Sequence, residues 1–263
     1  SLLTPEEYES AKRTTFSQFF TSPVVMEAMH GALSRLGVSP DATVFEPGCG
    51  VGAFMTHAPA FQRFIGVELD SLTGRIARVL NPKADIRIEN IRDSKLPPVD
   101  AVIGNVPFAN VHLDFHGEKL SLHDFCIAKS VEALRPGGVL AVVTSHFTMD
   151  KQNAAARELL ASQADFLGAI RLPCDAFKRE GTEVTTDILF LRKRAPGQAP
   201  NHADPEWLEP SMLGIQGADL PVNRYFCNHH EMVLGDWSRK DTLYGSGFSV
   251  KPVGDLASQL KEA

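Results

Sequence analysis

VFEPGCGVGAF, residues 44–54, joins an apolar strand to a helix through three glycines. The glycines let the backbone turn sharply and let a ligand approach it closely. The helix that follows offers free N–H groups at its first turn, where polar and anionic ligands bind. A strand, a glycine loop and a helix in this order predict a small-molecule site at the end of a strand in an α/β fold.

Strands and helices alternate on both sides of this stretch. Nearly continuous apolar runs predict strands at 42–48, 64–70, 84–90, 101–105, 137–145, 166–173 and 186–194, with helices at 54–64, 72–80, 122–135 and 153–163. Residues 5–37 are predicted helical, with Thr21 or Ser22 as an N-cap, Pro23 in the first turn and Gly37 as a stop. Apolar strands, each followed by a helix, indicate a Rossmann-like, mostly parallel sheet with helices on both faces.

The glycine spacing indicates which cofactor is bound. Gly48, Gly50 and Gly52 form GxGxG behind Glu46, whereas a dinucleotide fingerprint is GxGxxG. This pattern favours S-adenosylmethionine (SAM) over NAD. Glu68 ends the next strand and is placed to accept the ribose hydroxyls, or it is a solvated charge there. Asp70 is read as a helix N-cap.

The third predicted strand ends in polar residues. Asn90 or Asp93 is expected to meet the adenine edge of the cofactor, although Asp93 lies in a segment that is also consistent with a plain loop.

A second polar strand end follows in AVIGNVPFAN, residues 101–110. Asn105 offers a side-chain oxygen, Val106 a backbone carbonyl and Phe108 a flat ring, and Pro107 restricts the backbone between the last two. Two acceptors beside a stacking surface suit a planar substrate with an amino group. The alternatives are that Phe108 is a core aromatic and that Asn105 only ties off the strand.

The order TSP, FEPGCGVG, GVELD and GNVPF resembles the amino-methyltransferases, whose fourth strand ends in Asn-Pro-Pro-Phe/Tyr. Among them it is similar to the adenine-N6 DNA methyltransferases. GNVPF, LHDFCIAKSVEALRPGGVLAVVTS and NRYFCNHHEMVLG look like the methyltransferase module of large phage- and plasmid-borne helicase–methyltransferase polypeptides. The resemblance covers roughly residues 16–250.

This resemblance implies methyl transfer from SAM to the adenine amino group of DNA, with the target base flipped onto residues 105–108. It also implies that Thr21, Ser22 and Pro23 close over the methionine part of the cofactor, and that a helicase region lies in the same chain or a partner. Val106 stands where the family usually has proline. His123 and Asp124 are read as helix-capping residues rather than catalytic ones.

The charge balance limits the partners. The net charge is −6, and residues 196–263 hold 5 Lys/Arg against 9 Asp/Glu, so the chain lacks the basic footprint of a protein that binds long nucleic acid alone. DNA is therefore expected to contact another module or a local basic patch, for which the candidates are Lys178, Arg179, Arg192, Lys193 and Arg194. The alternative is that these residues are a solvated strand end.

The rest of the composition indicates a soluble, cytoplasmic protein. No apolar run is long enough for a membrane span, and there is no secretory leader. The four cysteines are widely spaced, which favours reduced thiols over a zinc site or a disulfide framework, and no metal is expected.

We expect a methyltransferase domain at 1–195, with an N-terminal helical segment, and an acidic Pro/Gly-rich extension at 196–263. Residues 195–221 are read as a linker or an extended wrap, and residues 255–263 are expected to form a short helix. Two other functions stay open: an amino-methyltransferase acting on protein glutamine or RNA, and a non-catalytic SAM-binding module of a larger helicase-linked protein.

Overall fold

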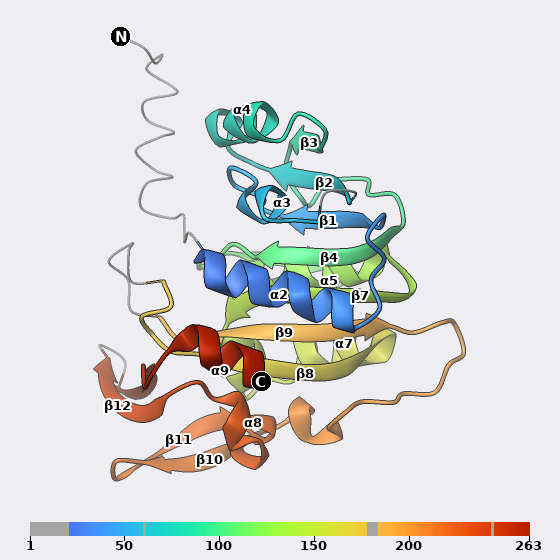
Figure 1. Cartoon of the computed structure of the whole chain (residues 1–263). Coiled ribbons are helices and arrows are strands. Elements are labelled where there is room, and N and C mark those ends of the chain that lie inside the picture. The colour runs from blue at the N-terminus through green and yellow to red at the C-terminus, as the bar shows by residue number, and fades with distance from the viewer. Residues whose placement is uncertain (1–20, 60–61, 178–183, 243–244) are drawn as a thin grey trace.

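The computed structural model describes residues 21–59, 62–177, 184–242 and 245–263. Its centre is a seven-stranded sheet in the order β3-β2-β1-β4-β7-β9-β8 (Figure 1). The strands are β1 (Thr43–Pro47), β2 (Arg63–Glu68), β3 (Asp85–Ile88), β4 (Val99–Asn105), β7 (Leu134–Ser145), β8 (Ala164–Leu172) and β9 (Thr186–Lys193). Only β9 runs antiparallel to its neighbours in this sheet, so the predicted mostly parallel sheet is confirmed.

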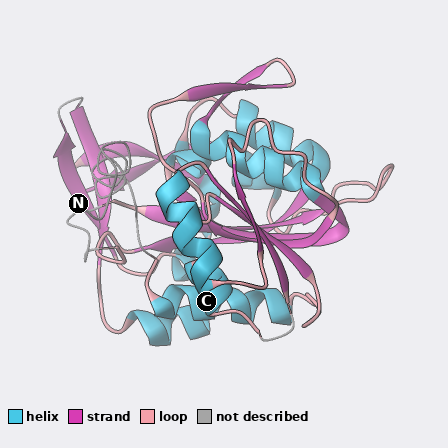
Figure 2. Cartoon of the chain, turned by 90° about the horizontal axis from the view of Figure 1, so that it is seen from above, coloured by secondary structure: helices cyan, strands magenta, loops and turns pink. Residues whose placement is uncertain are grey.

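Helices cover both faces of the sheet, as Figure 2 shows. The helices are α2 (Pro23–Arg35), α3 (Ala53–Thr56), α4 (Ser71–Leu80), α5 (Leu122–Ala133), α6 (Phe147–Asp150), α7 (Ala155–Gln163), α8 (Arg224–Asn228) and α9 (Leu256–Glu262). Alternate residues of a strand enter opposite core clusters. Val102 of β4 packs in the cluster with α5 and α7, whereas Ala101 and Ile103 pack in the cluster with α2 and α9.

The helix starts follow from their caps. The Ser22 hydroxyl accepts a hydrogen bond from the Val25 N–H at 3.4 Å, and Pro23 occupies the first turn of α2. Asp70 caps α4 through the Thr73 N–H at 2.8 Å, as predicted. The part of the predicted 5–37 helix before residue 21 lies outside the described residues.

Two predictions of secondary structure were wrong. The helix predicted at 54–64 is only α3, because Pro59 lacks a backbone donor and the chain turns there before β2 begins. The segment 195–221, read as a linker, holds a short 3₁₀ helix (Pro205–Leu208) and most of the hairpin of β10 (Pro210–Ile215) with β11 (Ala218–Asn223). A second hairpin, β12 (Asp236–Thr242) with β13 (Gly245–Lys251), follows it. The predicted C-terminal helix is present as α9.

The C-terminal segment packs into the core of the sheet. Trp207, Tyr225 and Phe226 belong to the same apolar cluster as α5 and α7, and the ring of Trp207 stacks on Phe166 of β8 at 4.8 Å. This segment is therefore held by side-chain burial, which its low periodicity does not reveal.

A buried ion cluster joins this segment to the sheet. Arg171 of β8 is fully buried and bonds Asp187 of β9 through two contacts of 2.8 Å. It also contacts Asp150 at 2.9 Å, and its guanidinium lies 4.1 Å from the ring centre of Phe226. The Asn223 N–H donates to Asp150 at 2.8 Å.

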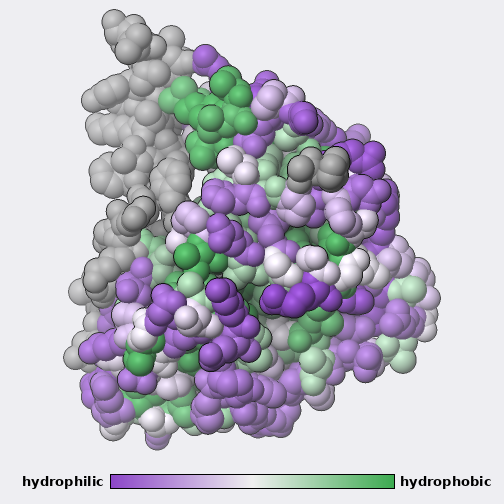
Figure 3. Space-filling model, in the orientation of Figure 1, coloured by the Kyte–Doolittle hydropathy of each residue, from purple (hydrophilic) through white to green (hydrophobic). Residues whose placement is uncertain are grey.

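The surface is mostly hydrophilic (Figure 3). In that view apolar atoms gather over α4. The exposed large apolar side chains of that region are Leu69, Ile76, Val79 and Leu80. Within the described residues, no helix has both the length and the apolar character that a membrane crossing requires.

Candidate functional site

A cavity of about 740 Å³ lies over the carboxyl ends of β1, β2 and β4, which point to the left in Figure 1. Because these strands are parallel neighbours, their polar ends meet at one edge of the sheet. Nine of the predicted site residues line it: Thr21, Glu46, Gly48, Gly50, Glu68, Asn90, Asn105, Val106 and Pro107. The glycine loop and the loop after β4 therefore face the same space.

The glycine loop is shaped by left-handed backbone at Gly48 and Gly50, with φ of 62° and 56°. A Cβ at Gly48 would lie 3.1 Å from Cδ of Pro107, so this glycine allows the two loops to approach each other. A Cβ at Gly50 would meet no atom within 4 Å. The Gly50 position thus leaves room at the cavity wall.

Gly52 has a different role from the predicted one and does not line the cavity. It precedes α3 with φ of 79°, and a Cβ there would collide with the side-chain amide of Asn81. That amide lies 3.4 Å from the carbonyl oxygens of Val51 and Gly52, to which it donates. Gly52 therefore serves the packing of the loop against the end of α4.

Two carboxyl groups enter the cavity from β1 and β2. Glu46 is 2% exposed, and its Oε2 has no hydrogen-bond partner among the described residues. Burial, and then the charge of Glu68, raise the pKa of Glu46 well above its usual value. Burial also raises the pKa of Glu68, although its oxygens accept from the N–H groups of Gly50 at 2.9 Å and Asp70 at 2.8 Å. Glu68 thus ties β2 to the glycine loop.

The end of β3 places its two candidates differently. Asn90 lines the cavity, and its side-chain oxygen accepts from the Arg92 N–H at 3.0 Å. Asp93 is exposed, pairs with Arg92 at 3.2 Å and does not line the cavity. The structure thus places Asn90, and not Asp93, beside the other candidate cofactor-binding residues.

The loop after β4 is anchored at both sides. The Asn105 amide nitrogen donates to the Thr21 hydroxyl at 3.3 Å, which joins the start of α2 to the strand end. Val106 is buried, and its N–H donates to the Val143 carbonyl at 3.0 Å, extending the β4–β7 ladder by one residue. A proline at position 106 would lack this N–H and could not form the hydrogen bond to Val143.

Phe108 and Ser22 do not line the cavity. Phe108 is half-buried, packs against the core and meets the His123 ring edge-on, with centroids 6.3 Å apart. Ser22 acts as the cap of α2. Of the predicted four-residue catalytic loop, Asn105, Val106 and Pro107 reach the cavity.

Comparisons with known proteins bear on the fold. No protein-family model matches the chain. The chain is 26% identical over 188 residues to defense against restriction protein B of Escherichia phage P1, a match that covers 67% of this chain and 8% of that protein.

Many solved structures resemble the chain. One is the methyltransferase subunit of a type I restriction-modification system from Streptococcus thermophilus, with TM-score 0.60, 17% identity and coverage of 89% of this chain and 56% of that one. Another is a protein from Listeria monocytogenes assigned to the class I SAM-dependent methyltransferases, with TM-score 0.57, 18% identity and coverage of 69% and 63%. The chain has the class I SAM-dependent methyltransferase fold.

Within this methyltransferase fold, several cavity residues escaped prediction. Ala109, Val111, Leu113 and Leu122 line the cavity on the side of the β5 (His112–Phe115) and β6 (Glu118–Ser121) hairpin. The hairpin turns through His116 and Gly117, both with positive φ. In the sequence, Gly117 is only a weak turn signal, and the positive φ values that define the turn are visible in the structure alone.

A buried polar network lies beside Leu122. Asp124 accepts from Ser121 at 2.5 Å, from Thr148 at 2.9 Å and from Lys151 at 3.0 Å. Ser121, not Asp124, is the N-cap residue of α5. Asp124 therefore links α5 to the segment after β7, where sequence reasoning expected a helix cap.

The candidate basic residues lie away from the cavity. Arg192 and Lys193 end β9 and Arg194 follows it, and because β9 is antiparallel to its neighbours this end lies opposite the cavity. Arg192 donates to the Leu36 carbonyl, Lys193 to Gln163, and the buried Arg194 to Asp165. These hydrogen bonds tie the three side chains to neighbouring elements, so the structure gives no support for a phosphate site there. Lys178 and Arg179 lie outside the described residues.

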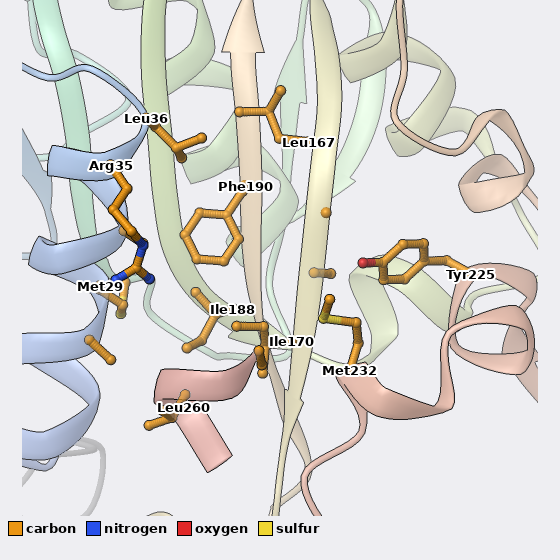
Figure 4. A pocket seen from close by; sticks show the side chains of 15 residues that line it. Met29, Arg35, Leu36, Leu167, Ile170, Ile188, Phe190, Tyr225, Met232 and Leu260 are labelled. Carbon is orange, nitrogen blue, oxygen red and sulfur yellow. The ribbon is translucent and has the colours of Figure 1, made fainter. Parts of the chain in front are cut away.

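A second cavity of about 210 Å³ lies between α2, β8, β9 and α9 (Figure 4). Its lining is mostly apolar, and Arg35 and Tyr225 contribute polar side-chain groups. The first cavity offers the carboxyl and amide groups that a nucleoside cofactor needs. Across the described ranges, no cluster of three or more His, Cys, Asp or Glu is placed to hold a metal ion.

Proposed function

We propose that this protein transfers a methyl group from SAM to the exocyclic amino group of adenine in DNA. The observation that supports this most is the shared cavity. The glycine loop and Glu68 lie on one side of it, and Asn105, Val106 and Pro107 lie on the other. A cofactor held by the first group can present a reactive methyl to a base held by the second.

The cavity residues fit SAM. The volume of about 740 Å³ lies within the range of small-molecule sites. Gly50 leaves open space at the wall, and the unpartnered Glu46 oxygen suits a cationic amino group. In the proposal Glu46 holds the methionine part, Glu68 the ribose and Asn90 the adenine edge, with Thr21 closing the cavity. When bound, SAM supplies an electrophilic methyl group on a sulfonium.

The loop after β4 would activate the target amine. The adenine amino nitrogen is a poor nucleophile because its lone pair is delocalised into the ring. Acceptors at its two hydrogens favour a pyramidal nitrogen and stabilise the developing positive charge. Asn105 would supply a side-chain oxygen and Val106 a backbone carbonyl. The Val106 carbonyl is held in place by the Val106–Val143 hydrogen bond on one side and by the Pro107 ring on the other.

Base flipping is part of the proposal, because the amino group must leave a duplex to enter the cavity. Phe108 would contact the base after a shift from its half-buried place against His123. No strong base is required, since the amino proton becomes acidic once the nitrogen carries the methyl group. Most of the rate gain would come from alignment.

We further propose that the chain works beside other modules, including a helicase region. The match to 8% of a long phage protein supports this, as does the similarity to a subunit of a restriction-modification system. The net charge of −6 supports it too, because a chain this acidic can neutralise few phosphates alone.

The test is transfer of radiolabelled methyl from SAM to duplex DNA, denatured DNA, RNA and a glutamine-containing release-factor substrate. We expect label on DNA adenine. Asn105→Ala should lower the rate by about 100-fold or more, the scale for one preorganised charge-stabilising group. SAM affinity and melting temperature should change little.

Asn228→Ala is the matched control for this variant. It removes an exposed amide on α8 that donates to Glu206 at 2.7 Å and does not line the cavity, so it should keep the activity. Full activity of Asn105→Ala would contradict the amine-activating role. Label on RNA or protein alone would favour those substrates, and SAM binding without any transfer would favour a non-catalytic module.

A further inference from the structure

A row of aromatic rings lies beyond the end of β7. Phe147 is 52% exposed and lies against the ring of its sequence neighbour His146, with centroids 4.1 Å apart and planes tilted by 34°. His146 meets Phe248 of β13 at 5.1 Å, and Phe248 meets Trp237 of β12 at 5.2 Å. The row therefore runs from α6 to the second C-terminal hairpin, with Phe147 at its open end.

The row rests on a rigid base. His146 contacts the buried Asp150 carboxylate at 3.0 Å, and Asp150 belongs to the Arg171 ion cluster. The Arg171 guanidinium lies 5.3 Å from the ring centre of Phe248 and 5.5 Å from that of Trp237. Rings held in this way lose little conformational entropy when a ligand stacks on them.

The row lies at the same edge of the sheet as the target side of the candidate site, because His146 follows β7 and β7 runs parallel to β4. β7 is the neighbour of β4, and Asn105 pairs with Val143 in their parallel register. Lys151, which follows α6, reaches Asp124, two residues from the cavity-lining Leu122. The cofactor loops lie on the other side of β4. A substrate whose base enters at Asn105 would thus lie toward Phe147.

The distribution of charged side chains also favours the β7 side for a nucleic-acid strand. The cofactor side of the cavity is lined by Glu46, Glu68, Asp70 and Glu89, which repel a polyanion where they are ionised. The β7 side carries Lys151, whose side chain is 35% exposed and pairs with the buried Asp124 at 3.0 Å. A nucleic-acid backbone would follow the second side.

We propose that Phe147, backed by His146 and Phe248, is a stacking platform for unpaired DNA nucleotides that flank the target adenine. This inference rests on the proposed function and names the substrate form that the site would favour. Every base has a flat π-face, so such a platform accepts single-stranded DNA with little regard to sequence. It also holds a strand with few ion pairs, which suits an acidic chain.

The test is fluorescence anisotropy of the whole chain with a fluorescein-labelled, mixed-sequence single-stranded oligodeoxynucleotide. Phe147→Ala should weaken binding by about 10-fold or more, the scale of losing one base–aromatic contact. Phe147→Trp should bind as well as the parent or better. Phe147→Leu, which keeps an apolar side chain but no ring face, should behave like the alanine variant.

Two controls separate stacking from other effects. Met212→Ala removes a side chain that is 58% exposed on β10, and it should leave binding unchanged. The fold-change for Phe147→Ala should be the same at low and high salt, because a stacked ring neutralises no phosphate. In methyl transfer to single-stranded DNA, the variant should raise KM and keep kcat.

The platform is wrong if Phe147→Ala binds the oligonucleotide like the parent, or if Phe147→Leu retains full binding, which would indicate a generic apolar contact. Equal loss of RNA and DNA binding would support stacking on any unpaired strand, whereas selective loss of RNA binding would overturn the assignment to DNA. The proposed function is tested separately, by measuring methyl transfer from SAM to DNA with the parent protein. If the parent methylates DNA and Phe147→Ala binds the oligonucleotide normally, the stacking platform is refuted and the proposed function stands.

Discussion

Glu46 shows how one buried residue can link cofactor binding to pH. Its position before the glycines was predicted from the sequence, and the structure adds that the carboxyl is buried and that one oxygen has no partner in the described part of the chain. Sequence spacing cannot reveal this desolvation, because burial depends on strands that lie far apart in the chain. The raised pKa means that the folded protein tends to keep the Glu46 proton.

Glu46→Gln should therefore stabilise the cofactor-free protein at neutral and higher pH. A carboxyl whose pKa is raised by folding costs nothing below its usual value near 4.5, and the cost grows as the pH rises toward the raised value. The melting temperature of the variant should exceed that of the parent at about pH 8, and the gap should close below about pH 4.5. Glu118→Gln, at an exposed carboxyl on β6, is the control.

SAM affinity should also depend on pH through Glu46, but in the opposite direction to the stability of the cofactor-free protein. A bound cation next to Glu46 favours its ionised form, so SAM should release protons on binding and bind more tightly as the pH rises. Calorimetry in buffers of different ionisation enthalpy measures this release. Proton release by Glu46→Gln equal to that of the parent would show that the Glu46 carboxyl is not the linked group.

At the scale of elements, the sheet could be predicted and the short hairpins could not. The strands β1, β4, β7 and β9 are nearly continuous apolar runs, a pattern typical of strands buried on both faces. The hairpins β5–β6 and β10–β11 are half-exposed and turn at His116–Gly117 and Gln216–Gly217, where only the backbone φ reveals the turn. Short strands of this kind have weak periodicity and are readily taken for loops.

Val106→Pro tests the register of β4 and β7 at the loop after β4. The sequence alone suggests that proline would restore the commoner loop without loss, because the carbonyl is retained. In the structure the Val106 N–H donates to Val143, so proline removes a buried hydrogen bond. We expect a loss of about 1 kcal/mol or more in the free energy of unfolding. Urea unfolding measures it, and an unchanged midpoint would contradict the observed register.

At the scale of the whole molecule, the C-terminal segment is joined to the sheet by a shared core and by the Arg171 cluster. The boundary proposed at residue 195 stays a prediction. The composition of the segment suggested a linker, because ion pairs and stacked aromatics with long sequence separation leave no periodic signal. Arg171 and Asp187 are 16 residues apart, and Asn223 reaches Asp150 over 73 residues.

Arg171→Met should destabilise the protein strongly, because it leaves Asp150 and Asp187 buried without their cation. Removing one partner of a buried ion pair costs about 3–5 kcal/mol. Arg135→Met is the matched control, since Arg135 forms a surface pair with Asp100 and its side chain is 51% exposed. That loss should stay below about 1 kcal/mol. Chemical unfolding that reports equal losses for both variants would refute the role of the cluster.

The place of β9 has a consequence for synthesis on the ribosome. β7 sends apolar side chains to both faces of the sheet, and its outer neighbour is β9, which lies 41 residues further along the chain when counted from Ser145 to Thr186. At ordinary translation rates this edge would stay unpaired for roughly 2–8 seconds. β8, although made earlier, pairs with β9 and not with β7. A nascent chain paused in this interval would display an apolar strand edge, the feature that recruits holding chaperones or seeds aggregation.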